Sequence, residues 1–272
     1  MININLRVRR ALREDQQQIA SLMFHEANMH RHLDWHSPID WLGSTKFWVL
    51  EDFGRVLAAF ACPEDPPDVA WIRLFVHLPI LSAAEAWQAL WGNSQIDFQP
   101  GGRIQTAAIV SKLWFQTLLL SSGFEIKQNI VFLDLSSENF NPFPIPQGIK
   151  IRPLHDEDIP SISQLDLDAF GPFWHNSADA LRLAFSQAVY ASVAENDLGI
   201  IGYQLSTGNP FGVHLARLAV RPDLKGRGVG AALVSDLVRR LGSHQTARFS
   251  VNTQADNKAS LSLYEKLGLK WK

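Results

Sequence analysis

Cysteine is nearly absent from this chain, since only Cys62 among 272 residues carries a thiol. The chain can therefore form no intramolecular disulfide and no thiolate metal cluster, as is typical of proteins of the reducing cytoplasm. Long apolar runs are also missing, because no segment approaches the roughly 20 residues of a membrane span. Residues 1–7 alternate like a strand and lack the apolar core of a signal peptide. We expect a soluble cytoplasmic protein that does not associate with membranes.

An excess of positive charge is missing as well. The formal net charge is −2, and binding to a nucleic-acid backbone depends on clustered basic residues, so we expect no nucleic-acid partner. Apolar residues make up 46% and charged residues 19% of the chain, which are proportions of a globular protein. A chain of this length has room for two domains of ordinary size.

A proline-rich stretch at 137–148 predicts a linker between a domain at 1–136 and a domain at 149–272. On each side the predicted order is strand, helices, three strands, helix, strand, helix. This repeat indicates one architecture used twice, an α+β (α/β/α) fold whose mixed, mostly antiparallel sheet is flanked by helices. In the first half we expect strands at 4–12, 47–50, 55–60, 69–78, 103–110 and 125–135, and helices at 13–28, 81–91 and 111–121. In the second half we expect strands at 149–152, 190–194, 199–206, 213–220 and 247–252, and helices at 156–169, 177–188, 227–241 and 257–267.

Histidines cluster near the N-terminus, at His25, His30, His32 and His36. The sequence His25-Glu26 followed by His30 is close to a zinc-binding helix motif. Its five-residue spacing, however, turns the second ring about 140° away from the first on a regular helix. We therefore expect polar surface and loop histidines, and no metal site.

The strongest motif is the glycine-rich segment Lys225-Gly226-Arg227-Gly228-Val229-Gly230, between an apolar strand and an amphipathic helix. Missing side chains let a ligand approach the backbone, and successive amides at a helix N-terminus favour a pyrophosphate. The simpler alternative is that the glycines serve only a tight turn. The segment lacks both the Gly-Lys-Ser/Thr ending of one nucleotide-binding motif and the later acidic residue of another.

With the preceding Val220 and Pro222, this segment resembles the acetyl-CoA pyrophosphate loop of the GNAT N-acetyltransferase superfamily. Residues 257–269 resemble the second CoA-binding helix of that family, Asn-x-x-Ala-x-x-Leu-Tyr-x-x-x-Gly-Phe. The resemblance covers 149–272 and is closest to the ribosomal-protein alanine N-acetyltransferase branch, through His-Leu-Ala-Arg-Leu-Ala-Val and Val-Asn-Thr-Gln. The chain departs from the family pattern at Lys225 (usually Arg or Gln), Ser260 (usually Ala) and Leu269 (usually Phe).

The resemblance implies transfer of an acetyl group from acetyl-CoA to a primary amine, by direct attack of the neutral amine. The cofactor would lie between the strands at 213–220 and 247–252. Tyr264 would protonate the departing thiolate as general acid, unless it is only a packing residue. The implied cofactor-binding residues are Leu218, Ala219, Val220, Lys225, Gly226, Arg227, Gly228, Val229, Gly230, Ala231, Asn252, Asn257 and Tyr264.

The general base and the acceptor pocket are less well defined. The branch can place a glutamate where this chain has Asn252, which cannot take a proton. His214 has a suitable intrinsic pKa; the alternatives are a water relay, or a histidine without a catalytic role. The aromatic residues Phe170, Phe173 and Trp174 fall where the family builds its acceptor pocket, and alternatively form a lid over the core.

The first half has Pro79-Ile80-Leu81-Ser82 in place of the glycine-rich segment, so we expect a degenerate copy without cofactor binding. After Gly268 the sequence leaves little room for the last strands of the fold. The sheet is then short at that edge, or it borrows a strand such as 125–135.

The expected function is acetyl-CoA-dependent N-acetylation of a peptide N-terminus or a small amine, by a monomer or homodimer without a metal. Two alternatives remain open. The chain could be a non-catalytic, acyl-CoA-binding regulatory protein, or its first half could be a module that docks a partner or substrate.

Overall fold

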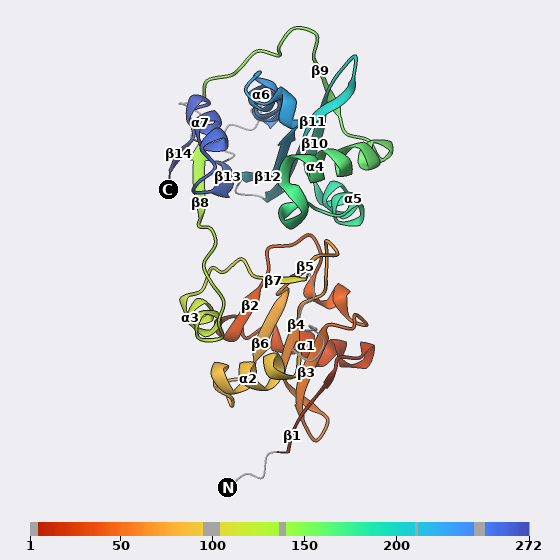
Figure 1. Cartoon of the computed structure of the whole chain (residues 1–272), viewed down its shortest axis with the longest axis vertical. Helices are drawn as coiled ribbons and strands as arrows, with labels where there is room; N and C mark the ends of the chain where they lie inside the picture. Colours follow the sequence, from red (N-terminus) through yellow and green to blue (C-terminus); the bar gives the residue numbers. More distant parts are fainter. Residues whose placement is uncertain (1–4, 95–103, 136–139, 210–211, 242–247, 272) are drawn as a thin grey trace. The chain divides into compact units, whose positions relative to one another are not determined.

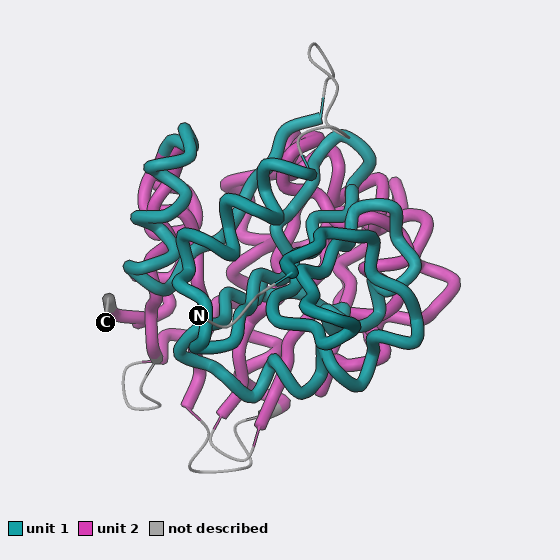
Figure 2. Tube along the Cα trace, turned by 90° about the horizontal axis from the view of Figure 1, so that it is seen from below, with its two compact units in different colours: residues 1–125 teal, residues 126–272 magenta. Residues whose placement is uncertain are grey.

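The computed structural model describes residues 5–94, 104–135, 140–209, 212–241 and 248–271 (Figure 1). The chain divides into two compact units, Met1–Glu125 and Ile126–Lys272 (Figure 2). We call them the N-terminal and C-terminal units and describe each by itself. Residues 137–139 of the predicted linker, and Arg103 and Ala247 at the start of two predicted strands, lie outside the described residues.

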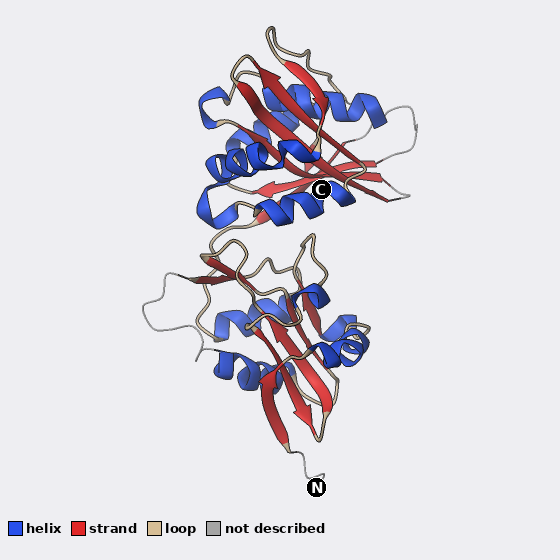
Figure 3. Ribbon diagram, turned by 90° about the vertical axis from the view of Figure 1, so that its right-hand side faces the viewer, coloured by secondary structure: helices blue, strands red, loops and turns tan. Residues whose placement is uncertain are grey.

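The N-terminal unit has a five-stranded sheet of order β1-β3-β4-β6-β2 and a short parallel pair, β5 with β7. Helices cover both faces of the large sheet, as Figure 3 shows. The strands are β1 (Leu6–Arg10), β2 (Met29–Arg31), β3 (Phe47–Asp52), β4 (Arg55–Ala61), β5 (Val69–Trp71), β6 (Leu74–His77) and β7 (Gln105–Ala107). The helices are α1 (Gln16–Leu22), α2 (Ala83–Ser94) and α3 (Leu113–Ser121), with short 3-10 turns η1 (Arg13–Asp15), η2 (Glu26–Asn28) and η3 (Pro38–Trp41).

The alternation of side chains along β3 explains the two layers of core. Trp48 and Leu50 pack in one hydrophobic cluster with residues of α2 and α3, whereas Phe47 and Val49 pack in another with α1. Successive side chains of a strand point to opposite faces, so a wholly apolar strand predicts burial on both faces. The continuous apolar run of β3 thus produces the two-sided core.

Three predictions for the N-terminal unit were wrong. The single strand expected at 69–78 is two strands, β5 and β6, which belong to different sheets. The helix expected at 13–28 ends at Leu22, and the chain then forms β2, which pairs antiparallel with β6. His30 and His32 are not surface residues, because only 3% and 8% of their areas are exposed. Among the described residues there is no group of metal-ligating side chains, and no helix there is long and apolar enough to cross a membrane.

The C-terminal unit has a seven-stranded sheet of order β14-β8-β13-β12-β11-β10-β9. Helices α6 and α7 cover one face through a core that includes Val234, Leu237 and Leu261, and α4 and α5 pack on β11 at the other face. The strands are β8 (Ile130–Leu135), β9 (Lys150–Pro153), β10 (Tyr190–Asn196), β11 (Gly199–Asn209), β12 (Gly212–Val220), β13 (Arg248–Gln254) and β14 (Lys270–Trp271). The helices are α4 (Ile159–Trp174), α5 (Ala178–Gln187), α6 (Val229–Leu241) and α7 (Lys258–Lys266), with 3-10 turns η6 (Asp156–Asp158) and η7 (Pro222–Leu224).

Strand β8 completes the edge of the C-terminal sheet. It pairs antiparallel with β13 on one side and with the two-residue strand β14 on the other. The pairing therefore agrees with one of the two alternatives from the sequence, that the second sheet borrows a strand such as 125–135. The compact units divide after Glu125, and not at the proline-rich stretch, because β8 finds its hydrogen-bond partners in the sheet that follows it.

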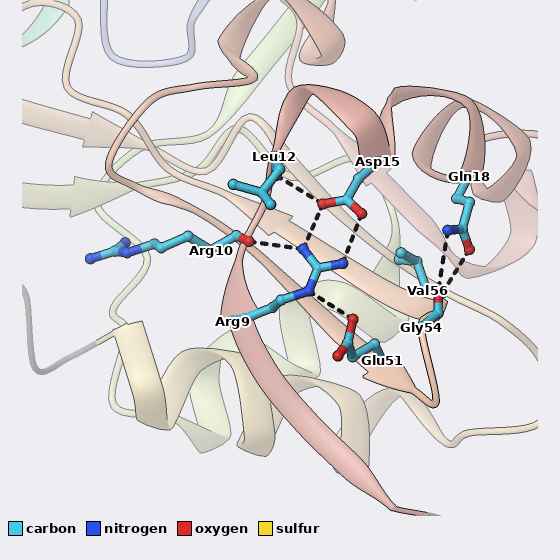
Figure 4. Close-up of polar contacts among 8 residues, drawn as sticks. All are labelled: Arg9, Arg10, Leu12, Asp15, Gln18, Glu51, Gly54 and Val56. Carbon is cyan, nitrogen blue, oxygen red and sulfur yellow. Dashed lines mark hydrogen bonds and ion pairs between the residues drawn. The ribbon is translucent and has the colours of Figure 1, made fainter.

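A three-residue ion cluster fixes the first strand of the N-terminal unit (Figure 4). Arg9 donates two hydrogen bonds to the carboxylate of Asp15, at 2.7 and 2.8 Å, and a third from Nε to Glu51 at 2.7 Å. Asp15 also accepts the backbone amide of Leu12 at 2.8 Å. The cluster joins β1, η1 and β3.

The same cluster recurs in the C-terminal unit. Arg152 donates to Asp158 at 2.7 and 2.9 Å and from Nε to Glu195 at 2.8 Å, and Asp158 accepts the amide of His155 at 2.9 Å. These residues lie on β9, η6 and β10, the counterparts of β1, η1 and β3. The repeat of side-chain geometry supports the repeated architecture, which residue identity alone is too weak to establish.

Candidate cofactor and acceptor site

The C-terminal sheet opens between its two parallel strands. β12 and β13 pair only from Gly212 opposite Arg248 to Leu215 opposite Val251, after which β12 continues beside β11 and β13 beside β8. Ala216 is an extra residue, a β-bulge that increases the local twist. Within the described part of the chain, the edge of 216–220 that faces β13 has no strand partner. The predicted opening between these strands is therefore present in the structure.

The predicted pyrophosphate loop follows at the end of β12. Gly226 and Gly228 have φ values of +78° and +85°, which favour glycine, and Lys225 and Arg227 are exposed. The amide of Ala232 donates to the carbonyl of Gly228 at 2.9 Å and begins the ladder of α6. The amides that precede it have no acceptor within the helix, so they form a partly positive end that suits an anion.

Gly230 lets three elements approach one another. A Cβ atom at this position would lie 2.9 Å from Cδ1 of Leu263 on α7, and 3.6 and 3.8 Å from side chains of Val220 and Leu218 on β12. A larger residue would push α7 away from the start of α6. The third glycine thus serves close packing, whereas the other two serve backbone conformation.

Tyr264 lies on α7 with only 4% of its area exposed, in the cluster that also contains Leu215 and Val251. Burial raises the pKa of its phenol well above the ordinary value. The phenol therefore keeps its proton at neutral pH, which is the state that a general acid requires.

Asn257 is the N-cap of α7. Its Oδ1 accepts the amide of Ser260 at 3.1 Å, and its Nδ2 lies 3.5 Å from Oε1 of Gln254. Its carboxamide oxygen is thus engaged in the cap, which is the structural role that such a residue commonly has. A cofactor contact by Asn257 stays a prediction.

His214 and Asn252 meet where β12 and β13 begin to diverge. Oδ1 of Asn252 lies 3.0 Å from Nε2 of His214, and Oγ of Ser250 lies 3.0 Å from Nδ1. Because an amide oxygen only accepts, Nε2 donates, and the neutral ring then accepts the Ser250 hydroxyl at Nδ1. Burial lowers the pKa of His214, and the hydrogen bond with Asn252 opposes that shift only in part.

This polar cluster faces the helices α4 and α5. Leu215 and Val251 point into the core under α6 and α7, so the neighbouring side chains point the other way. A pocket of about 240 Å³ adjoins His214 and Ser250. The other residues that line it are Thr207, Gly208, Asn209, Gly212, Val213 and Arg248.

The predicted aromatic residues lie at the end of α4. Phe170, Phe173 and Trp174 are half-buried and belong to this helix, which is interrupted at Gly171 (φ +73°) and contains Pro172. The sequence placed them in a connection between two helices, whereas the helix resumes for one turn after the glycine. The rings of Phe173 and Trp174 make an edge contact at 5.2 Å.

Sequence reasoning missed the ion pair that holds this aromatic end against β12. Arg217 donates to both oxygens of the buried Asp166, at 2.8 and 2.7 Å, and to the carbonyl of Trp174 at 2.7 Å. Its guanidinium lies 3.6 Å from the ring centre of Phe170, and Tyr203 also donates to Asp166. The sequence did hold a signal for this pair. Asp166 and Arg217 each stand among apolar residues, and charged side chains are seldom buried unless they are paired with an opposite charge.

The N-terminal unit fills the corresponding opening with its own chain. Strand β6 pairs with β4 on one side and with β2 on the other, so β2 takes the edge that stays open in 216–220 of β12. His30 of β2 stacks on Phe115 at 4.1 Å and its Nε2 contacts the carbonyl of Ile72 at 3.1 Å. These buried contacts close the opening. Burial also lowers the pKa of His30 to about 4, so its ring is neutral at neutral pH.

The helix that follows β6 is capped by its own side chains. Glu85 accepts the amide and the hydroxyl of Ser82 at 2.9 and 2.6 Å, and the amide of Glu85 donates to Ser82 Oγ at 3.2 Å. This capping box places a carboxylate at the N-terminus of α2, where α6 leaves amides without helical partners. An external anion would therefore compete with Glu85.

The counterpart of α7 lacks the tyrosine. The amide of Phe124 donates to the carbonyl of Leu119 in α3 at 3.1 Å, as the amide of Leu269 does to Tyr264 at 2.9 Å. Gly123 and Gly268 have φ values of +86° and +95° at the same place in the two turns. Leu119 therefore stands where the other unit has Tyr264.

The described residues thus hold one α+β architecture twice, and in the second copy 216–220 of β12 have an edge without a strand partner. Residues 159–269 match the family model of the acetyltransferase (GNAT) family. These residues therefore form a domain of the GNAT acetyltransferase family, a family of acyltransferases. An acetyltransferase of Sodalis glossinidius is 40% identical over 50 residues, a match that spans 18% of this chain and 35% of that protein.

Solved structures show the tandem fold. A tandem GNAT protein from the clavulanic acid biosynthesis pathway is 18% identical, with a TM-score of 0.66 over 98% of this chain and 97% of that one. A probable N-acyltransferase from Enterococcus faecalis is 12% identical, with a TM-score of 0.76 over 98% of this chain and 70% of that one. The ribosomal-protein-S18-alanine N-acetyltransferase of Escherichia coli is 22% identical over 44% of this chain and 76% of that one, but its TM-score of 0.40 supports no assignment to that branch.

Proposed function

We propose that the chain transfers an acetyl group from acetyl-CoA to a primary amine, and that the C-terminal unit alone binds the cofactor. The observation that carries the proposal is the opening between β12 and β13, which runs from the His214 cluster toward the glycine loop at the end of β12, while Tyr264 packs in the core cluster with Leu215 and Val251. Members of the matched family use acetyl-CoA as donor, and the single cysteine suits a reducing cytoplasm.

The cofactor would use the backbone of the slot more than its side chains. The open edge of Leu218 to Val220 offers amides and carbonyls to a pantetheine arm, as a neighbouring strand would. The loop from Gly226 to Ala231 offers amides to a pyrophosphate. The bound thioester supplies an activated acetyl carbon, and the residues around it control the protons.

Two protons must move when the amine attacks and the carbon–sulfur bond breaks. The attacking nitrogen loses one proton, which passes through the Ser250 hydroxyl to Nδ1 of His214, since that nitrogen accepts Ser250 in the resting state. The departing sulfur gains the other proton from the phenol of Tyr264. Asn252 orients the imidazole through Nε2 and takes no proton.

The acceptor would approach from the face of α4 and α5. The pocket beside His214 is lined mainly by small and polar residues, and Arg217 holds the aromatic end of α4 against β12, the strand that also carries His214. A small amine or a peptide N-terminus with polar groups next to the nitrogen fits this lining.

The test is release of free CoA from acetyl-CoA in the presence of a panel of small amines and short peptides. We expect turnover with at least one acceptor, and loss of that turnover in Tyr264→Phe. Tight binding of acetyl-CoA without turnover for any acceptor would favour the regulatory alternative. One observation favours that alternative: Asn252 stands where a proton-accepting glutamate is expected.

A further inference from the structure

The proline-rich segment at 140–148 is not a free connection between the units. It joins β8 to β9 within the C-terminal unit and passes over α6 (Figure 1). The amide of Asn141 donates to the carbonyl of Leu267 at 3.0 Å, and the amide of Phe143 donates to Oγ of Ser235 at 2.8 Å. Arg239 donates to the carbonyl of Phe143 at 2.9 Å. Both the amide and the carbonyl of Phe143 therefore bond side chains of α6.

These anchors follow one face of α6. Gly228, Ser235 and Arg239 are separated by seven and four residues, which places them above one another on a helix. The ring of Phe143 lies at the N-terminal end of this face. A Cβ atom at Gly228 would come within 2.5 Å of its Cε1 atom. The ring therefore rests directly on the backbone of the predicted pyrophosphate loop.

The part of the loop before Gly228 is held only weakly by its own hydrogen bonds. Its backbone bonds are long, with the amides of Lys225 and Arg227 both 3.4 Å from their acceptors, and residues 225–227 are exposed. Gly226 and Gly228 add the conformational freedom of residues without Cβ. A loop that is ordered before binding gives higher affinity, because less entropy is lost when the ligand arrives.

We propose that Phe143 is a positioning residue for the cofactor: its ring holds Gly228 in the conformation that presents the loop amides to the pyrophosphate. This proposal rests on acetyl-CoA binding at the loop, as argued above. Phe143 is 41% exposed although its backbone is anchored on both sides.

The experiment is calorimetric titration of CoA into the full chain and into Phe143→Ala, with Ile145→Ala as the matched control. Ile145 belongs to the same segment and is 42% exposed. Phe143→Ala should weaken CoA binding roughly fivefold to tenfold, the scale of one well-packed side chain at a binding site. The KM for acetyl-CoA should rise by the same factor with kcat unchanged, and Ile145→Ala should behave as the wild type.

A second variant separates positioning from folding. Phe143→Leu keeps an apolar side chain on Gly228 and should recover most of the affinity, with melting temperatures confirming that all variants fold. Equal affinity in Phe143→Ala and Ile145→Ala would overturn the proposal, and so would tighter binding in Phe143→Ala, which would mean that the ring obstructs the site. A wild-type chain that binds no CoA would instead refute the proposed function.

Discussion

The two units share a framework but differ at one strand edge, at the start of one helix and at the position of Tyr264. Both fix their first strand with an arginine held by an aspartate and a glutamate, and both end their last helix at a glycine of positive φ. Among the described residues of the C-terminal unit, 216–220 of β12 have no strand partner on one edge, and the first amides of α6 have no acceptor within the helix. The N-terminal unit covers the same edge with β2 and caps α2 with Glu85.

In the N-terminal unit, the chain itself supplies contacts that we propose acetyl-CoA supplies in the C-terminal unit. Strand β2 pairs with the edge that corresponds to the proposed site of the cofactor arm, and Glu85 lies at the helix N-terminus that corresponds to the proposed pyrophosphate site. Open strand edges and uncapped helix ends are costly unless something binds them. In the N-terminal unit, residues of the chain itself bind the strand edge and the helix end. In the C-terminal unit, we propose that acetyl-CoA binds them.

The largest expected effect is that of Tyr264→Phe. The phenylalanine cannot donate a proton, and neither can Leu119, the residue at the same position of the N-terminal unit. We expect kcat to fall by roughly 10²- to 10⁴-fold, because the leaving thiolate loses its acid. The affinity for CoA should be unchanged. Tyr190→Phe is the matched control, because it also removes one tyrosine hydroxyl from the C-terminal unit, a hydroxyl that donates to Asp236 of α6 at 2.6 Å. Similar kcat values in the two variants would exclude Tyr264 as the acid.

His214→Gln tests the other end of the slot. We expect kcat to fall roughly 10²-fold, because the amine proton loses its acceptor. The lowered pKa of His214 means that the wild-type ring stays neutral as the pH falls to its ordinary value of about 6.5. The acidic limb of the wild-type kcat profile should therefore lie below that pH and be absent in the variant. A limb that persists in His214→Gln would assign the base to another group.

Gly226→Val tests the loop against its counterpart. A β-branched residue at φ +78° is strained, so the loop should change its conformation and weaken CoA binding by roughly tenfold to a hundredfold. Pro79→Gly, at the corresponding turn of the N-terminal unit, should leave the affinity unchanged. An equal loss of affinity in both variants, measured by calorimetry, would mean that the two units do not differ as described.

The smallest expected effect is on stability, and it concerns the ion cluster that both units share. The arginines hold the pKa values of Asp15 and Asp158 below their ordinary range. Each carboxylate therefore stabilises its unit above the unfolded pKa, near 3.9, and that contribution is lost as the pH falls through the lowered folded pKa. We expect Asp15→Asn and Asp158→Asn to cost about 1 to 2 kcal/mol each at neutral pH. Urea unfolding that shows a cost in only one unit would argue against equivalent frameworks.

The local parts of the site were predictable from the sequence, and the long-range parts were not. The glycine loop and the Asn257–Tyr264 helix are contiguous motifs, whose residue types follow from backbone conformation and helix capping. The place of β2 depends on pairing with residues more than 40 positions away, and its short polar sequence resembles the end of a helix. The Asp166–Arg217 pair and the contact of Phe143 with Gly228 likewise join distant segments, so no local pattern identifies the partner.

The most direct test of the central claim is amide hydrogen exchange of the full chain with and without CoA, followed by mass spectrometry. We predict that CoA slows exchange at 216–220 and 226–231 in the C-terminal unit. Exchange at β6 and in the first turn of α2 should not change, because β2 and Glu85 already occupy those groups. New protection at the start of α2, or no protection at 226–231 when CoA is bound, would contradict the account.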